Sequence, residues 1–243
     1  MRISCLAITE GRPEFAEWLC WQYLKQDYQD REFILVASAK DGKLIKFVRE
    51  RIPGAIIETT VDGTWVPVKR NIAMHLATGD AITWFDDDDW RSHEHLTFVA
   101  ELYKGHQAVI PSGTGLYYFD LKRWMAKHFK CGAWSWGLYD RDLALSIPFN
   151  EKQRRATDTK WYGEIKTKLA RDPSLAFTER AMSGHCMAVS HRKNISNPQW
   201  VASKMTHKYD FSHVMERLVL APGEREVIAE HLARIKKRQE ITR

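Results

Sequence analysis

The sequence predicts an α/β fold in which a mostly parallel central sheet is flanked by helices. In residues 1–111, short apolar runs alternate with segments whose apolar residues recur every three or four positions, the pattern of βαβ units. Turn signals such as Pro53-Gly54 and Thr78-Gly79-Asp80 separate these segments. Hydrophobic residues make up 44% and charged residues 28% of the 243 residues, a composition typical of a globular domain.

The first half contains the clearest elements. Each predicted strand is a short apolar run, and each predicted helix places its apolar residues on one face. The strands are expected over residues 3–8, 33–37, 56–57, 81–85 and 108–111. The helices carry Phe15, Trp18, Leu19 and Tyr23, then Leu44, Ile45 and Val48, then residues 68–77, and finally Leu96, Val99, Ala100 and Tyr103. Ser92 is expected to cap the last of these helices.

The second half is richer in aromatic residues. Residues 116–119 and 134–139 are predicted as strands, and the basic stretch 122–130 separates them. Helices are expected over 158–169 and, with an apolar side, over 224–238. Because no repeat or long linker interrupts the chain, we expect one domain over 1–243.

Composition excludes several classes of protein. No apolar run approaches the roughly 18 residues of a membrane-spanning helix. The start lacks the features of a secretory signal, so a cytoplasmic location is expected. The four cysteines show no Cys-x-x-Cys pair, which predicts reduced thiols rather than a zinc site or disulfides. The net charge of +6 indicates an anionic partner or a solvated basic surface.

Four consecutive aspartates, Asp86 to Asp89, follow the strand predicted over 81–85. Open α/β sheets bind ligands at the carboxyl ends of their strands. Adjacent carboxylates repel one another, and a hard divalent cation such as Mg²⁺ or Mn²⁺ would relieve that repulsion and bridge them to a diphosphate. The alternative is a solvated acidic loop that caps the next helix. The glycines of an EF-hand, of a dinucleotide fold and of a phosphate-binding loop are absent.

Motifs in order along the chain resemble the family 2-like glycosyltransferases of GT-A fold. Residues 8–15 are similar to the opening strand and Thr-x-x-Arg-Pro-x-Phe turn of the family, and residues 26–28 to the segment before its second strand. Lys69-Arg70-Asn71, the turn over 77–80 and the aspartate run resemble its Arg-Asn helix, Ala-x-Gly turn and metal-binding Asp-x-Asp. The spacing of these last three motifs is the most specific signal in the sequence.

The resemblance implies a role for individual residues. The implied nucleotide-sugar-binding residues are Thr9, Arg12, Ser38, Arg70, Asp86 and Asp87, the implied metal-binding residues are Asp86, Asp88 and His191, and the implied catalytic base is Asp158. His185 is a reserve for His191, which is otherwise a packing or surface residue, and Asp158 is otherwise a helix cap. Members of the family usually have an acidic pair after the second strand, and this sequence lacks it. Ser38 or Asp41 is then expected to bind the nucleotide base.

The implied activity is a metal-dependent, inverting transfer of a sugar from a nucleotide diphosphate sugar to a hydroxyl acceptor. Residues 1–111 would form the nucleotide-sugar half, 112–220 the acceptor-binding and catalytic half, and 221–243 a basic C-terminal helix. The acceptor implied by the family is a glycan or a lipid-linked sugar. The rings of Trp134, Trp136 and Trp161 are expected either to contact it or to pack in the core.

Three other functions stay open at this point. A hydroxymethylated base in DNA would be an acceptor if basic residues contacted phosphates; those residues are Lys122, Arg123, Lys127, Lys130, Arg154 and Arg155. The missing acidic pair would also suit a non-catalytic binding module. The aspartate run together with His93-Glu94-His95 would suit a metal-dependent nuclease.

Overall fold

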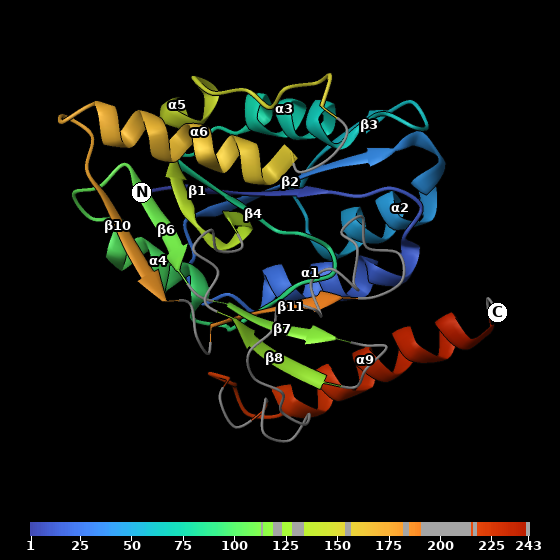
Figure 1. Cartoon of the computed structure of the whole chain (residues 1–243). Coiled ribbons are helices and arrows are strands. Elements are labelled where there is room, and N and C mark those ends of the chain that lie inside the picture. Colours follow the sequence, from blue (N-terminus) through green and yellow to red (C-terminus); the bar gives the residue numbers. More distant parts are fainter. Residues whose placement is uncertain are drawn as a thin grey trace.

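The computed structural model describes residues 1–112, 114–118, 123–127, 134–153, 157–181, 185–190, 215 and 218–241. A seven-stranded sheet lies at the centre, in the order β10-β6-β9-β4-β1-β2-β3 (Figure 1). Its strands are β1 (Ile3–Ile8), β2 (Arg31–Ser38), β3 (Ile56–Thr60), β4 (Ala81–Trp84), β6 (Ala108–Ser112), β9 (Leu138–Asp140) and β10 (Phe177–Ala181). All neighbours are parallel except β9, which is antiparallel to both β4 and β6. The predicted α/β fold with a mostly parallel sheet is confirmed.

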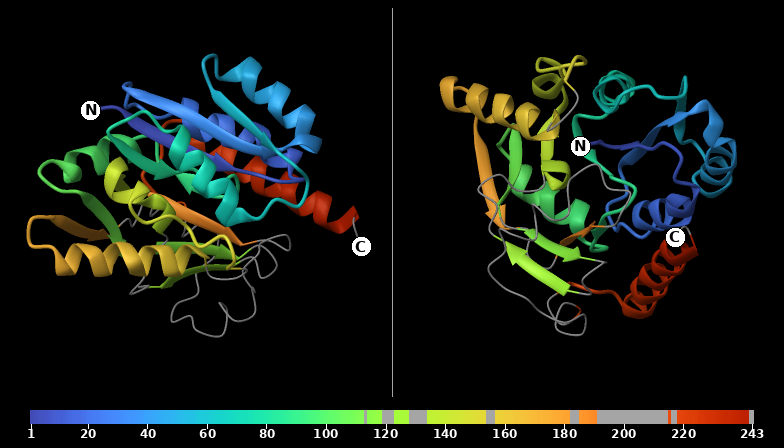
Figure 2. Two further views of the ribbon diagram at one scale, coloured as in Figure 1. Left: turned by 90° about the horizontal axis from the view of Figure 1, so that it is seen from above. Right: turned by 45° about the vertical axis from the view of Figure 1, so that its right-hand side comes forward.

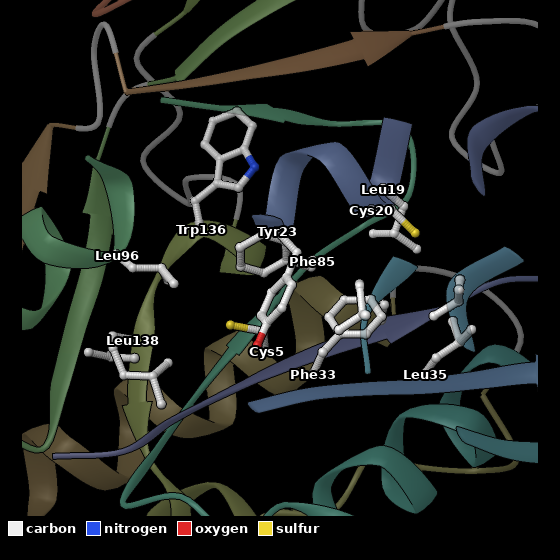
Figure 3. Close-up of a cluster of buried hydrophobic side chains, with 14 of the residues drawn as sticks. Cys5, Leu19, Cys20, Tyr23, Phe33, Leu35, Phe85, Leu96, Trp136 and Leu138 are labelled. Carbon is white, nitrogen blue, oxygen red and sulfur yellow. The ribbon is translucent and has the colours of Figure 1, made fainter. Parts of the chain in front are cut away.

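Helices cover both faces of this sheet (Figure 1). One face packs against α1 (Ala16–Leu24), α2 (Gly42–Arg51) and α4 (His95–Tyr103), and the other against α3 (Val66–Leu76), α5 (Arg141–Leu145) and α6 (Thr157–Arg171). Successive side chains of a strand point to opposite faces, so Cys5 joins the first cluster and Leu6 the second. Figure 3 shows Cys5 packed among Tyr23, Phe33 and Phe85 in the first cluster.

A smaller sheet lies beside the central one (Figure 1). Its strands, in spatial order, are β5 (Trp90–Arg91), β11 (Cys186–Ser190), β7 (Thr114–Tyr118) and β8 (Arg123–Lys127). Because β5 pairs with β11, the residues directly after the aspartate run are joined to a distant part of the chain. The last helix, α9 (Glu224–Ile241), follows, and none of the described helices is long and apolar enough to span a bilayer.

Two local predictions are wrong. The segment predicted as a strand over 134–139 begins with a 3-10 helix, Trp134–Trp136, and only β9 follows as a strand. At Gly137 an added Cβ would lie 2.6 Å from the carbonyl oxygen of Val109, so the backbone passes too close for a side chain. Helix α4 begins at His95 without a side-chain cap, and the Ser92 hydroxyl instead contacts Nδ1 of His185 at 3.0 Å.

The turn before β4 is anchored by a buried carboxylate. Glu32 accepts hydrogen bonds from the Ser4 hydroxyl at 2.6 Å and from the backbone amide and hydroxyl of Thr78, each at 2.7 Å. Burial alone would raise the pKa of Glu32, but these hydrogen bonds hold it below its usual value. Gly79 is required here, because an added Cβ would lie 2.6 Å from the Arg2 carbonyl oxygen. This turn therefore positions β4 and the aspartate run that follows it.

Candidate active site

Residues from several chain segments meet at the carboxyl ends of the parallel strands. Strands β1, β2, β3 and β4 run in the same direction, so the residues that follow them lie along one edge of the sheet. Thr9 and Arg12 follow β1, Ser38 ends β2, and the aspartate run follows β4. The sequence-predicted residues of the first half are thereby brought together at this edge.

Arg12 binds two neighbouring carboxylates of the aspartate run. Its Nη2 lies 2.9 Å from Oδ1 of Asp87, and its Nη1 donates to Oδ2 of Asp88 at 2.9 Å. Thr9 donates its hydroxyl proton to the other oxygen of Asp87 at 2.7 Å. The planar guanidinium thus holds two side chains through charge-assisted hydrogen bonds. The loop after β1 and the loop after β4 are joined through these contacts.

The aspartate run carries more negative charge than its neighbours balance. Burial raises the pKa of Asp87 to about 7 against the opposing charge of Arg12, and Asp88 adds to the rise. Burial likewise raises the pKa of Asp89 well above its usual value, and Asp88 and Asp86 add to it. The raised pKa values mean that ionising all four groups costs free energy in this site. A cation bound among them would offset that cost.

Arg70 lies beside Asp86. Nη2 of Arg70 lies 3.9 Å from Oδ1 of Asp86, whose side chain is 25% exposed. The guanidinium also lies over the Phe149 ring, 5.2 Å from its centroid. Burial lowers the pKa of Arg70, and the carboxylates of Asp86 and Asp158 act against that effect. Asp158, the second residue of α6, therefore lies on the same side of the molecule as the Arg70 guanidinium and interacts with its charge.

Helix α3 ties three segments of the site together through consecutive residues. Lys69, although buried, donates its ammonium to the Thr9 carbonyl oxygen at 3.0 Å and to Glu10 at 2.9 Å. Arg70 faces Asp86, as described above. Asn71 donates to the Phe149 carbonyl oxygen at 3.0 Å and accepts from the Phe149 amide at 2.8 Å. We assigned no role to Lys69 from the sequence, although it lies in the Lys69-Arg70-Asn71 motif.

The residues expected near a nucleotide base have partners within the chain. Ser38 is buried and donates its hydroxyl proton to Asp62 from the loop after β3. Asp41 is also buried, and its two carboxylate oxygens share the single N–H of Gly11, at N–O distances of 2.9 and 3.2 Å. Asp41 therefore holds the loop that leads to Arg12, and Asp62 supplies a carboxylate beside Ser38.

Two of the three tryptophans expected to bind an acceptor lie in the interior. Trp136 is 0% exposed and donates its indole proton to the Asp89 carboxylate at 3.0 Å. Trp161 is 2% exposed, and its ring stacks on Phe149 with a centroid distance of 5.0 Å. This burial fits the alternative that they pack in the core and leaves neither ring face open to an acceptor. The side chain of Trp134 lies outside the part of the chain that the structure describes.

His185 and His95 lie near the aspartate run but contact other side chains. His185 contacts Ser92 and stacks on Phe98 with a centroid distance of 4.2 Å. His95 is buried with Nδ1 3.3 Å from Sγ of Cys186, and burial lowers its pKa well below the usual value. These contacts do not support a nuclease that uses the His93-Glu94-His95 cluster. His191 and the basic residues Lys122, Lys130, Arg154, Arg155, Arg192 and Lys193 lie outside the described residues.

The acidic residues at this edge could hold a hard cation together with ligands from a bound substrate, but not by themselves. Within the described residues, no three His, Cys, Asp or Glu side chains are arranged as a complete metal site. Asp86 and Asp88, however, each raise the pKa of Asp89, so their negative charges repel a neighbouring carboxylate. Mg²⁺ and Mn²⁺ are commonly held by one or two carboxylates together with substrate phosphates. The donor set fits that arrangement.

Comparison with known families identifies the family of this chain. The sequence model described as "Glycosyl transferase family 2" matches residues 18–191. This chain belongs to glycosyl transferase family 2. The predicted family is confirmed, and the predicted enzyme class, a glycosyltransferase, is that of the family. The matched residues include Arg70, the aspartate run and Asp158 but not α9.

Solved structures share the fold of this chain. TarS residues 1–349 from S. aureus in complex with UDP-GlcNAc match with a TM-score of 0.63 at 14% identity, over 80% of this chain and 60% of that one. A mannosyltransferase from Pyrobaculum calidifontis, in complex with GDP-Man and Mn²⁺, matches with a TM-score of 0.59 at 13% identity, over 82% of this chain and 59% of that one. This chain thus spans less than two thirds of the length of these two proteins. No curated protein sequence matches it significantly.

The raised pKa of Asp87 predicts how pH affects metal binding. The folded-state pKa of about 7 lies above the usual 3.8, so the folded state binds more protons between these values. This group therefore contributes stability at low pH that is lost as pH rises through about 7. Since protons and cations compete for carboxylates, Mn²⁺ should raise the melting temperature more at about pH 8 than at about pH 5.5.

Differential scanning fluorimetry with and without Mn²⁺ at both pH values measures this effect. In Asp87→Asn the difference between the two pH values should shrink, because the variant side chain does not titrate. Equal Mn²⁺ shifts at both pH values in the unmodified protein would contradict the prediction.

Proposed function

We propose that this glycosyltransferase is metal-dependent and inverting, and that it moves a sugar from a nucleoside diphosphate sugar to a hydroxyl group. The observation that carries the proposal is the arrangement of Arg12, Arg70 and Asp158 around the aspartate run at the strand ends. Two cationic side chains, a set of poorly balanced carboxylates and a further carboxylate on α6 together suit a diphosphate leaving group and an incoming hydroxyl.

The donor would lie along the edge formed by β1, β2 and β4. Thr9 and Arg12 would contact the nucleoside, and Ser38 would meet the base together with its partner Asp62. Asp86 and Asp87 would contact the ribose and diphosphate, with Arg70 beside them. The nucleotide complexes of TarS and of the Pyrobaculum mannosyltransferase, which have the same fold, support a donor of this class.

Asp86 and Asp88 would hold Mn²⁺ or Mg²⁺, and His191 would complete the shell. The bound cation would neutralise charge that develops on the diphosphate as it leaves. The Mn²⁺ found with GDP-Man in the Pyrobaculum enzyme supports this assignment. Arg12 would keep Asp87 and Asp88 aligned and would place a fixed positive charge at the same point.

Asp158 would act as the catalytic base. As the acceptor oxygen forms its bond to the anomeric carbon, the bond from that carbon to the diphosphate oxygen breaks, and Asp158 takes the proton of the acceptor hydroxyl. Attack opposite the leaving group inverts the anomeric configuration. The charge of Asp158 acts on Arg70, which lies beside Asp86, and this supports the role.

The acceptor would be a glycan or a lipid-linked sugar. A hydroxymethylated base in DNA is the second candidate, favoured by the net charge of +6. DNA binding of that kind should weaken steeply as salt concentration rises. Absence of binding to duplex DNA even at low salt, measured by a filter-binding titration, would rule out the DNA candidate.

A panel of nucleoside diphosphates and their sugars, with and without Mn²⁺, tests donor binding by thermal shift. A ligand at about 100 times its dissociation constant adds about 2.7 kcal/mol, which raises the melting temperature by several degrees in a domain of this size. We expect nucleotides of one base to stabilise the protein, and more strongly with Mn²⁺. The absence of a shift with every nucleotide at millimolar concentration would overturn the proposal.

A further inference from the structure

Helix α9 packs against residues next to the aspartate run, although it lies outside the residues matched by the family. Figure 2 shows it alongside α1, on the side of the molecule that carries the smaller sheet. Its buried residues Ile228, Leu232 and Ile235 form one apolar cluster with Trp18 and Trp90. Trp90 directly follows the aspartate run, so this cluster joins the C-terminal helix to the site.

The first residue of α9 binds the residue that follows the aspartate run. The Glu224 carboxylate, which is buried, accepts a hydrogen bond from the indole of Trp90 at 3.0 Å and another from the Ala221 amide at 2.8 Å. It also forms an ion pair with Lys25 at the end of α1. The Lys25 ammonium lies over the Trp90 ring, 4.8 Å from its centroid. A buried ion pair therefore fixes Trp90 between α1 and α9.

A second contact reaches the run through α1. The His231 ring stacks on Trp18, with centroids 3.9 Å apart and planes 3° from parallel. Trp18 in turn donates its indole proton to the Asp89 carbonyl oxygen at 3.0 Å. His231 also meets the edge of Phe15, and the Arg12 guanidinium lies over the Phe15 ring, 5.7 Å from its centroid. The side chains that hold Asp89 and Arg12 thus pack on one residue of α9.

We propose that α9 is a brace that positions the aspartate run, with Glu224 and His231 as positioning residues. Glu224 acts by holding Trp90, and His231 acts by holding Trp18 against the Asp89 backbone. The Asp89 carbonyl oxygen and the Trp90 indole are then both held by hydrogen bonds. The inference rests on the proposed function, because the geometry that the brace maintains is the one assigned to metal and donor binding.

Partners behind metal-binding side chains commonly change metal affinity or activity by about 10- to 100-fold when they are removed. We expect an effect in that range here, without direct contact between α9 and the substrate. Since removing only one member of a buried ion pair often unfolds a protein, the test changes both members of the pair at once.

A matched pair of double variants tests the hydrogen bonds that the Glu224 side chain accepts from Trp90 and Ala221. Lys25→Met with Glu224→Gln keeps an acceptor for the Trp90 indole, whereas Lys25→Met with Glu224→Met removes it while remaining uncharged and similar in size. His231→Phe and His231→Leu form the corresponding pair for the Trp18 stack. Glu226→Ala, at an exposed position of the same helix, is the control.

Hydrogen exchange measures the brace without any ligand. In the Met-Met and Leu variants, we expect amides over residues 86–91 to exchange faster, while those of β2 stay as in the unmodified protein. In the Gln and Phe variants the exchange rates over residues 86–91 should be close to those of the unmodified protein, and in Glu226→Ala they should be the same. Unchanged exchange over 86–91 in both the Met-Met and Leu variants would overturn the brace.

Steady-state kinetics on the same variants connects the brace to the reaction. The Mn²⁺ concentration at half-maximal activity should rise by about tenfold or more in the Met-Met variant. A lower melting temperature with an unchanged Mn²⁺ requirement would show a merely structural helix. If the activity of the unmodified protein does not depend on Mn²⁺, the proposed metal dependence is wrong. The hydrogen-exchange measurement then still decides whether α9 positions the aspartate run.

Discussion

Asp88→Asn is expected to lower the rate of sugar transfer by at least about 10³-fold. Loss of this carboxylate removes part of the charge that would hold the cation, and such a cation contributes several kcal/mol to the leaving-group step, at 1.36 kcal/mol for each tenfold in rate. Initial rates with the donor found in the nucleotide panel measure the effect. The Mn²⁺-dependent thermal shift should disappear in the same variant.

The thermal stability of metal-free Asp88→Asn should not fall with its activity. Asp88 adds to the raised pKa of both Asp87 and Asp89, so removing its charge relieves repulsion in the metal-free protein. The melting temperature without metal is therefore expected to stay level or rise. Asp142→Asn is the control, because its side chain is 83% exposed on α5 and should alter neither rate nor metal response. A retained Mn²⁺ shift in Asp88→Asn would contradict the assignment of Asp88 to the metal.

Asp158→Asn is expected to reduce kcat by about 10²- to 10⁴-fold, the usual contribution of a well-placed general base. Asparagine keeps the size of the side chain but takes up no proton. Because the proposed role concerns the acceptor hydroxyl, the KM for the donor should change little. Single-turnover kinetics at saturating donor measures the chemical step separately from product release.

A neighbouring variant separates catalysis from helix stability. Glu164→Gln lies on the same helix and is exposed, so it should retain full turnover. If Asp158→Asn kept its turnover within threefold of the unmodified enzyme, Asp158 would be a helix residue without a catalytic role. A large rise in donor KM with unchanged kcat would assign it to donor binding instead.

Local sequence patterns were sufficient for the first half of the fold. Residues 3–8 and 81–85 are short apolar runs, and the structure places strands at Ile3–Ile8 and Ala81–Trp84. The reason is physical: a strand buried on both faces requires apolar residues throughout, and that requirement appears directly in the sequence. The position of the aspartate run at a strand end follows from the same pattern.

The second half was harder to predict because its elements depend on distant partners. Strand β5 is only two residues long, Trp90–Arg91, and it exists because it pairs with Cys186 and Met187. A run so short carries no period that could be recognised. Aromatic residues raised a similar difficulty, since both sugar binding and core packing use large rings, and only their neighbours show that Trp136 and Trp161 are buried.

The sequence determined the α/β class, the aspartate run at the end of a strand and the resemblance that the family match confirms. These features are local, because periodicity and motif spacing involve residues close together in the chain. Only the tertiary structure shows that Arg12 binds Asp87 and Asp88, that Lys69 supports the β1 loop, and that Glu224 holds Trp90. Glu224 and Trp90 are separated by 134 positions, and a contact of that kind is set by packing of the whole chain rather than by either neighbourhood.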